Sequence, residues 1–272
     1  MEKDRGKKMN GKITSGAVLC LCALATAPGA SAGTGHGFYL GATAGAGDVM
    51  ATDLRQRGAV HLGPGKLPID AEGPTEHRTR VHLGSLQFGY AFAPWQTAQS
   101  PWGITPALEL EGIYIGKHSP TGDMPVHPAF LGTQYVTVPT QAGLLMGNAI
   151  LIFRTPWAES IFPVLGVGAG AAFVSIRGAD SANPGEPGIN HFNSDPDASD
   201  TAFALQLRAG LNIKLGANLH LLTEYRYLTI DATRYTFGAT DYPGEHQPTD
   251  RWRLDMARQK YHLVTAGIHY RF

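Results

Sequence analysis

Histidine and serine side chains are the first candidates for chemistry in this sequence. Eleven histidines are present, yet none belongs to an H-E-x-x-H motif, and no pair has a clear metal-ligand spacing within one predicted strand. A serine aligned with a histidine could act as nucleophile and base in acyl transfer. His82 and Ser85 have opposite parity along a strand unless a bulge intervenes, as do His118 and Ser119. We therefore expect no catalytic, cofactor-binding or metal-ligating residue.

Further polar side chains fall in or beside predicted loops. Residues 193–200 gather acids, but they lack the turn glycine and the distal glutamate of a calcium-binding loop. Solvation is the usual state of a histidine in such loops, and we interpret these side chains in that way. The histidines concerned are His61, His77, His118, His127, His191 and His246.

A second set of charged residues alternates with apolar ones, which is the period of a β-strand. Residues 201–215 are the clearest case, with Phe203 and Leu205 on one parity and Arg208 and Lys214 on the other. If the apolar face points to lipid, the polar face lines a narrow lumen, where acids and bases should pair and close the barrel. A soluble lipocalin-like barrel would show the same alternation with the apolar face inside. The predicted lumenal residues are Glu109, Glu111, Arg208, Lys214, Glu224, Arg226, His269 and Arg271.

Eight such segments can be marked, and their connections alternate in length. Most segments exceed the ~5–6 residues of a typical strand and fit the ~9–11 tilted residues that cross a bilayer. The connections after the first, third, fifth and seventh segments are long, and those between them are short. This predicts an eight-stranded antiparallel up-and-down barrel with long external loops and short periplasmic turns. The segments are 36–47, 78–92, 103–118, 137–154, 160–176, 201–215, 218–231 and 260–272.

The two ends of the chain indicate the same compartment. Residues 1–32 have a basic start, an apolar run too short for the ~20 residues of a spanning helix and an Ala30-Ser31-Ala32 cleavage site, so we expect a cleaved signal peptide. Both cysteines of the chain fall within that segment, so we expect no disulfide in the mature protein. The last segment places Val264, Ile268 and Phe272 on one apolar face. We expect it to pair with the first strand and close the barrel.

Some segments resist a simple assignment. Val81 and Leu83 differ in parity from Leu86 and Phe88, which predicts a bulge near Gly84 or a start of the strand above the bilayer. The faces of segment 137–154 cannot be assigned. Trp252, among charged residues, is expected to pack on the barrel rim rather than to anchor a ligand. Aromatic residues beside the short turns and at the chain ends predict one interfacial girdle, comprising Phe38, Tyr39, Phe92, Trp95, Trp102, Phe153, Trp157, Phe162, Tyr270 and Phe272.

Four short motifs resemble a known family. They are Gly37-Phe38-Tyr39-Leu40-Gly41-Ala42, the glycine-rich 163–170, Glu224-Tyr225-Arg226-Tyr227-Leu228 and the closing 267–272. Across the mature chain the sequence resembles the OmpA-type and opacity-protein-like family of small outer-membrane β-barrels. The resemblance implies eight strands and assembly by machinery that reads the last strand, with Tyr270 and Phe272 as the insertion signal. Family members serve as structural proteins, adhesins or surface antigens, and a few related small barrels are enzymes.

We therefore predict an all-β chain with one barrel domain, residues 33–272, in the outer membrane. A structural or surface-interaction role is expected, carried by the long loops and without catalysis. A narrow porin-like channel is the main alternative, and a lipid A-modifying enzyme is the third. The expected partners are outer-membrane lipids and lipopolysaccharide, the assembly machinery and a host or surface ligand at the loops. A formal net charge of zero gives no indication of nucleic-acid binding.

Overall fold

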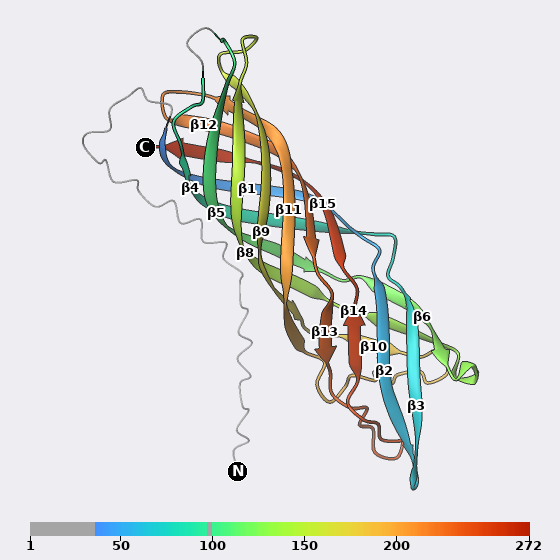
Figure 1. Ribbon diagram of the computed structural model, residues 1–272. Coiled ribbons are helices and arrows are strands. Elements are labelled where there is room, and N and C mark those ends of the chain that lie inside the picture. Colours follow the sequence, from blue (N-terminus) through green and yellow to red (C-terminus); the bar gives the residue numbers. More distant parts are fainter. Residues whose placement is uncertain (1–35, 97–99) are drawn as a thin grey trace, which may run out of the picture. The chain divides into compact units, whose positions relative to one another are not determined.

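The computed structural model describes residues 36–96 and 100–272, and the predicted signal peptide lies outside this part of the chain. Eight long antiparallel strands close into a barrel in the order β1-β15-β12-β11-β9-β8-β5-β4 (Figure 1). The predicted fold is confirmed, with strand bounds that agree to within a few residues. The barrel strands are β1 (Gly37–Met50), β4 (Arg78–Ala91), β5 (Gly103–His118), β8 (Thr140–Arg154), β9 (Ile161–Ile176), β11 (Ala198–Lys214), β12 (Leu219–Ile230) and β15 (Gln259–Arg271).

The first and last strands close the sheet, as predicted. β1 pairs with β15 from Tyr39↔Arg271 to Val49↔Tyr261, and its other edge pairs with β4. A closed sheet leaves no edge strand with unpaired backbone N–H and C=O groups. Strands in lipid need this pairing, because no water is present there to form hydrogen bonds with those groups. Val264 and Ile268 of β15 point outward and are exposed, and Phe272, which follows the strand, is exposed as well.

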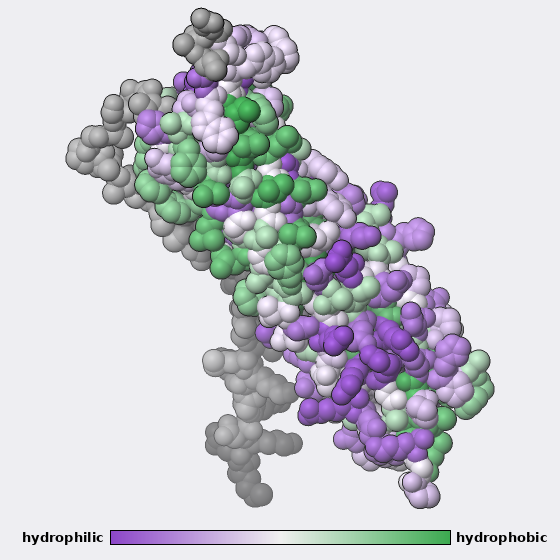
Figure 2. Space-filling model, in the orientation of Figure 1, coloured by the Kyte–Doolittle hydropathy of each residue, from purple (hydrophilic) through white to green (hydrophobic). Residues whose placement is uncertain are grey.

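The outer surface of the barrel is apolar. Leu86 is 72% exposed, and Leu108, Val167 and Leu207 of three other strands are also exposed. Figure 2 shows this apolar surface over the barrel, while hydrophilic residues cover the opposite end of the folded chain. An exposed apolar area of this extent is unfavourable in water and is suited to lipid. Among the described residues, no helix has the length and apolarity that a membrane-crossing helix needs.

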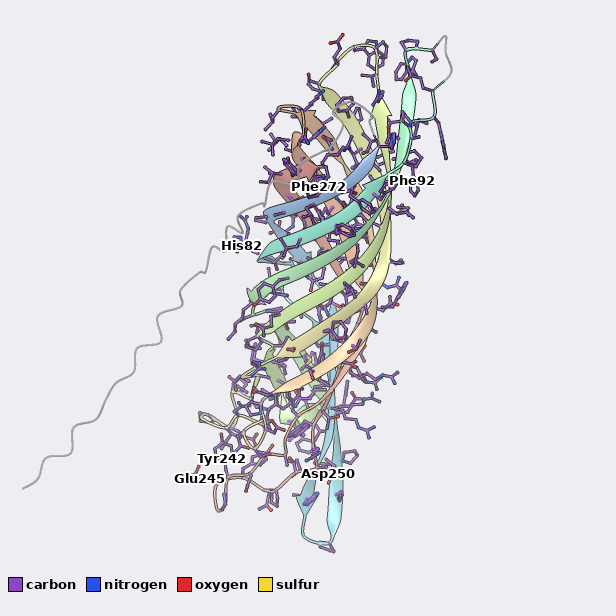
Figure 3. The ribbon with its side chains drawn as sticks, turned by 90° about the vertical axis from the view of Figure 1, so that its left-hand side faces the viewer. His82, Phe92, Tyr242, Glu245, Asp250 and Phe272 are labelled. Atoms are coloured by element: carbon purple, nitrogen blue, oxygen red, sulfur yellow. The ribbon has the colours of Figure 1, made fainter. Side chains whose placement is uncertain are left out.

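Aromatic side chains gather at the end of the barrel that carries the short turns. Trp95, Trp102 and Trp157 are exposed there together with Phe92 and Phe272, and Figure 3 shows Phe92 and Phe272 near this end. Their positions agree with the predicted girdle. Two members of the predicted set point inward instead. Tyr39 is buried, and Phe162 packs against an interior cluster.

The four long connections, which the sequence analysis treated as external loops, carry strands that pair into a second sheet. Its order is β10-β7-β6-β3-β2-β14-β13, and we call it the external sheet. Each connection contributes at least one strand, so segments far apart in sequence lie side by side (Figure 1). The strands are β2 (Asp53–Leu62), β3 (Gly65–Pro74), β6 (Thr121–His127), β7 (Thr133–Thr137), β10 (Asp180–Ala182), β13 (Thr233–Thr236) and β14 (Arg253–Met256), and the short 3-10 helix η1 (Ala129–Leu131) joins β6 to β7.

The interior changes character along the barrel axis. On β4, Ser85 and Gln87 face inward at mid-height, and Val81 and Leu83 continue on the same inward face toward the external sheet. The pairing of β1 with β4 runs without a register shift from Gly37↔Ala91 to Met50↔Arg78, so the predicted bulge near Gly84 is wrong. The parity conflict arose because the inner face itself turns from polar to apolar.

The apolar part of the interior continues into the external sheet. Ile115 and Leu263 of the barrel belong to one buried cluster together with Leu54, Met124 and Leu254 of the external sheet. The strand whose faces the sequence left open, β8, contributes Leu144 and Met146 to this cluster and Asn148 to the polar layer. The external sheet is therefore held to the barrel by a shared core.

Candidate functional sites in the barrel and in the external sheet

Five charged side chains form one buried network at mid-height in the barrel. β5 supplies Glu109 and Glu111, β11 supplies Arg208, and β12 supplies Glu224 and Arg226, because alternate residues of each strand face inward. Arg208 binds Glu109 through Nη1 at 2.5 Å and Glu224 through Nη2 at 2.8 Å. Arg226 binds Glu111 through Nη1 at 2.5 Å and Glu224 through Nη2 at 3.0 Å. The predicted pairing of lumenal charges is confirmed for these five residues.

Neutral side chains complete the network. Three carboxylates and two guanidinium groups leave one formal negative charge, which must be balanced by hydrogen bonds or a proton. Tyr39 donates to Glu109 at 2.9 Å, and Gln87 donates to Glu111 at 2.9 Å. Asn148 donates to Glu109 at 3.0 Å, and Gln206 donates to Glu111 at 2.9 Å. The predicted lumenal set includes no glutamine or asparagine, although the alternation places Gln206 on the same polar face as Arg208.

The remaining predicted lumenal residues lie toward the turn end. His269 faces Gln87 at 2.7 Å and stacks on Tyr39. Arg271 is half-buried there and joins no ion pair within the described residues. The prediction for Lys214 is wrong, because it is the last residue of β11 and is exposed at the barrel rim. The end of a strand projects beyond the enclosed interior. The alternation of side chains does not show at which residue this happens.

The interior is nearly filled. Beside Arg208, Glu224 and His269 the structure leaves a cavity of about 10 Å³. A cavity needs roughly 10–15 Å³ to hold a single water molecule. An eight-stranded barrel is just wide enough for side chains to fill, and here the charged layer fills it.

A second cluster of titratable groups lies in the external sheet region. Glu186 and His191 follow β10, and His246 lies between β13 and β14. Nε2 of His191 is 3.1 Å from Glu186 Oε2, and Nε2 of His246 is 3.4 Å from Glu186 Oε1. Both imidazole rings are largely buried, so the interpretation of His191 and His246 as solvated loop residues is wrong. Burial lowers the pKa of His191.

Buried side chains fix His191 in place. Its ring meets that of Trp252 edge-on, with centroids 5.8 Å apart. Trp252 is buried in the core of the external sheet and donates to Thr240 Oγ1 at 3.0 Å, rather than packing on the barrel rim. No sequence pattern predicts this arrangement, since the three members of the cluster lie in two separate connections.

An open groove runs beside this cluster. Glu186 and His246 form part of its wall, together with Tyr242, Phe130 and Leu67. Figure 3 places Tyr242 at this end of the folded chain, far from Phe272. The groove thus offers apolar contacts and polar groups at a surface that faces away from the barrel.

Solved structures provide the only similarities found. Comparison with models of protein families and with curated proteins found no match. Neisserial surface protein A is 13% identical, with 86% of this chain and 97% of that chain covered and a TM-score of 0.37. The outer membrane protein OprG from Pseudomonas aeruginosa is 16% identical, with 87% and 96% covered and a TM-score of 0.41. The outer membrane protease OmpT from Escherichia coli is 8% identical, with 86% and 97% covered and a TM-score of 0.44.

The closed barrel combines an apolar outer surface with a charged, filled interior. The protein has the fold of a small transmembrane β-barrel. In such a barrel the lumen network and the external cluster have different surroundings. The first is enclosed by the barrel wall within the membrane, and the second lies beyond it in water.

Proposed function

We propose that this outer-membrane barrel is a surface-interaction protein whose external sheet presents the binding surface. The observation that carries the proposal is the folding of all four connections into one sheet with a core continuous with that of the barrel. Ordered strands lose less conformational entropy on binding than flexible loops do, which favours a preformed surface. The barrel then acts as the anchor, and the role is adhesin-like or antigen-like.

The filled interior argues against the porin-like alternative. The side chains of Arg208 and Arg226 are each 1% exposed and are paired with carboxylates of two strands, β5 and β12. Opening a path for solutes would require these ion pairs to separate inside the barrel, which is costly. We therefore propose that the closed barrel conducts ions poorly.

The catalytic alternative lacks an aligned pair of groups. Ser85 points into the barrel and lies 2.7 Å from Thr43 Oγ1, whereas His82 is exposed on the outer face. Figure 3 shows His82 at the side of the barrel. A nucleophile and its base must come within hydrogen-bond reach, and these two residues of one strand face opposite ways. We propose a role without catalysis on lipid A.

Lipopolysaccharide is the partner that the barrel wall itself suggests. Exposed basic residues lie near the external ends of the barrel strands, among them Arg80, Lys117, Arg177 and Lys260. Positive side chains at this level can pair with the phosphate groups of the outer leaflet. We propose that they anchor the barrel among these lipids, while the assembly machinery reads the terminal Tyr270 and Phe272.

A loop-exchange experiment tests the proposed role. Bacteria would display either the intact protein or a barrel whose four external connections are replaced by short turns, and adhesion to host cells and matrix would be counted. Heat-modifiable gel mobility of both proteins would show that each barrel is folded. We expect adhesion to be lost with the external sheet. Equal adhesion by the two proteins would contradict the proposal.

Two further measurements separate the alternatives. Large, stable single-channel currents from the purified protein in planar bilayers would favour the channel. A change in lipid A acylation between a deletion strain and its complemented parent, measured by mass spectrometry, would favour the enzyme. We expect small or absent currents and unchanged lipid A.

A further inference from the structure

We propose that Glu186, His191 and His246 form a binding site for a divalent transition-metal ion of the zinc type. This goes beyond the proposed surface role and does not depend on it. Two imidazole nitrogens and a carboxylate are a ligand set that zinc uses in proteins, with a fourth position left for water or another donor. One ligand atom from each of the three residues lies within 4.8 Å of the others.

The hydrogen bonds of the two rings select the nitrogen that faces the site. Nδ1 of His191 lies 2.8 Å from the carbonyl oxygen of Ser181, and Nδ1 of His246 lies 2.5 Å from that of Gln247. A carbonyl oxygen can only accept, so each Nδ1 carries the proton and each neutral ring keeps a lone pair on Nε2. This Nδ1-to-carbonyl contact is the one that orients metal-ligating histidines. The amide nitrogen of Gln134 lies 3.1 Å from the same Nδ1 of His191. This assignment requires that amide to be turned so that its oxygen accepts from Nδ1, and the two ends of a glutamine amide are placed from the hydrogen-bond network rather than observed.

The Nε2 atoms then face a carboxylate. Each lone pair is directed at an oxygen of Glu186, at 3.1 Å from His191 and 3.4 Å from His246. The two Nε2 lone pairs and the carboxylate are all hydrogen-bond acceptors. At these distances they repel one another unless a cation lies between them. Ligands about 2.0–2.1 Å from a tetrahedral zinc lie about 3.3 Å from each other. Each ring nitrogen lies at about that distance from one carboxylate oxygen, His191 from Oε2 and His246 from Oε1, so the carboxylate of Glu186 reaches both rings.

The surroundings favour zinc over calcium or magnesium. Calcium and magnesium prefer oxygen ligands, with six or more around calcium, and two of these three ligands are nitrogens. The His191 ring is held by Trp252 and Ser181, so little ordering is needed when the ion binds. Glu186 and His246 line the groove, which leaves the fourth coordination position accessible from solvent.

A bound ion would also join two connections that are distant in sequence. Glu186 and His191 belong to the segment between β10 and β11, and His246 belongs to that between β13 and β14. An ion that binds only the folded arrangement stabilises it by mass action. Zinc should therefore protect both segments against proteolysis.

The test uses the purified mature protein, folded in detergent micelles and freed of metal with a chelator. Zinc is titrated by calorimetry, and cobalt(II) is used as a spectroscopic probe of tetrahedral coordination. His246→Gln and Glu186→Gln each remove one ligand that is not in the core of the external sheet. His77→Gln and Glu76→Gln serve as matched controls, since both residues are exposed and lie outside the cluster. Heat-modifiable mobility shows that every variant is folded.

We expect one zinc ion per chain, binding weakened roughly tenfold or more in both ligand variants, and wild-type binding in both controls. Zinc should slow cleavage within 177–197 and 231–258 in the wild type and not in the ligand variants. Absence of zinc binding, equal binding by the ligand variants, or calcium binding as tight as zinc binding would each overturn the proposal. Nitrogen NMR of metal-free protein that shows both rings doubly protonated at neutral pH would also overturn it, since Glu186 would then be balanced by imidazolium ions.

Discussion

The barrel and the external sheet use the same alternation of apolar and polar residues but turn opposite faces inward. In β11 of the barrel, Leu205 and Leu207 are exposed while Arg208 is buried. In β2 of the external sheet, Leu54 is buried while Arg55 is exposed. The inward face is therefore not set by the strand pattern. It is set by what lies outside, which is lipid for one sheet and water for the other.

The barrel interior and the external sheet also differ in what stabilises them. A buried apolar side chain adds stability in proportion to its area, whereas a buried ion pair mainly avoids the large cost of unpaired charge. Removal of one member of an ion pair should therefore strongly destabilise the barrel. The external sheet should be destabilised by the loss of buried apolar volume. Surface charges on the external sheet should matter least.

Removing one guanidinium from the lumen should give the largest effect. Arg226 binds Glu111 and Glu224, so Arg226→Met leaves uncompensated carboxylates in the barrel. We expect a loss of about 3–5 kcal/mol in the free energy of unfolding, measured by urea titration in lipid vesicles with tryptophan fluorescence. Arg253→Met, at an exposed position of β14, is the control. A loss of less than about 1 kcal/mol for Arg226→Met would show that the network relaxes around the missing charge.

Two leucines of one strand test the apolar side of the comparison. Leu54 is 0% exposed and Leu62 is 51% exposed, and both belong to β2. Leu54→Ala leaves a cavity in the shared core and should cost about 2–5 kcal/mol, whereas Leu62→Ala should change stability by about 0.5 kcal/mol or less. Hydrogen exchange of the external strands would report both changes. Equal effects would mean that the external sheet does not depend on its buried face.

The same contrast explains what the sequence could and could not predict. In the barrel, Arg208 and Glu224 were assigned to the lumen because their parity is opposite to that of exposed leucines. The lumen position of Lys214 failed because parity does not show where a strand leaves the enclosed space. β4 looked bulged because Val81 and Leu83 belong to an interior that has become apolar above the charged layer. The external strands were taken for loops because they are short or polar and become a sheet only by pairing with distant segments.

The cluster of Glu186, His191 and His246 could not be predicted from the sequence for a related reason. Glu186 and His191 lie five residues apart in the irregular segment that follows β10, and His246 comes from another connection. No spacing rule joins them. Only the packing of Trp252 and the ordering of both connections on the external sheet bring the three side chains together.

A glycine in the charged layer offers a finer test. Gly210 of β11 lies opposite Glu224, and an added Cβ would come within 2.1 Å of the Thr223 carbonyl oxygen and 2.8 Å of Glu224 Cγ. Gly210→Ala should therefore push the backbone of β12 away at Thr223, shift Glu224 with it and cost about 1–3 kcal/mol. The control is Gly143→Ala in β8, where no described atom lies within 4 Å of the added Cβ. The same urea titration in vesicles measures both, and a loss shared by the two variants would point to the backbone rather than to the network.

The smallest effect should come from a charge pair on the water side. Arg55 and Asp70 pair across β2 and β3 at 2.5 Å, with both side chains well exposed. The hydrogen bond from Arg55 lowers the pKa of Asp70 from its usual value. A lowered pKa stabilises the folded state above the usual carboxyl pKa of about 3.9, and this contribution is lost as the pH falls through the lowered value. Solvent and salt screen the pair, so the change in stability should be smaller than that of Gly210→Ala.

NMR titration of the carboxyl groups can detect the Arg55–Asp70 ion pair even where the change in unfolding free energy is too small to measure. The pKa of Asp70 should lie below the usual carboxyl value in the wild type and rise toward that value in Arg55→Met, because the hydrogen bond from Arg55 is the largest cause that lowers it. It should also rise toward that value when salt is added to the wild type, because exposed charges are screened. Insensitivity to both changes would mean that Asp70 is held by its strand environment and not by Arg55. The external sheet would then depend on its surface charges even less than the comparison with the lumen implies.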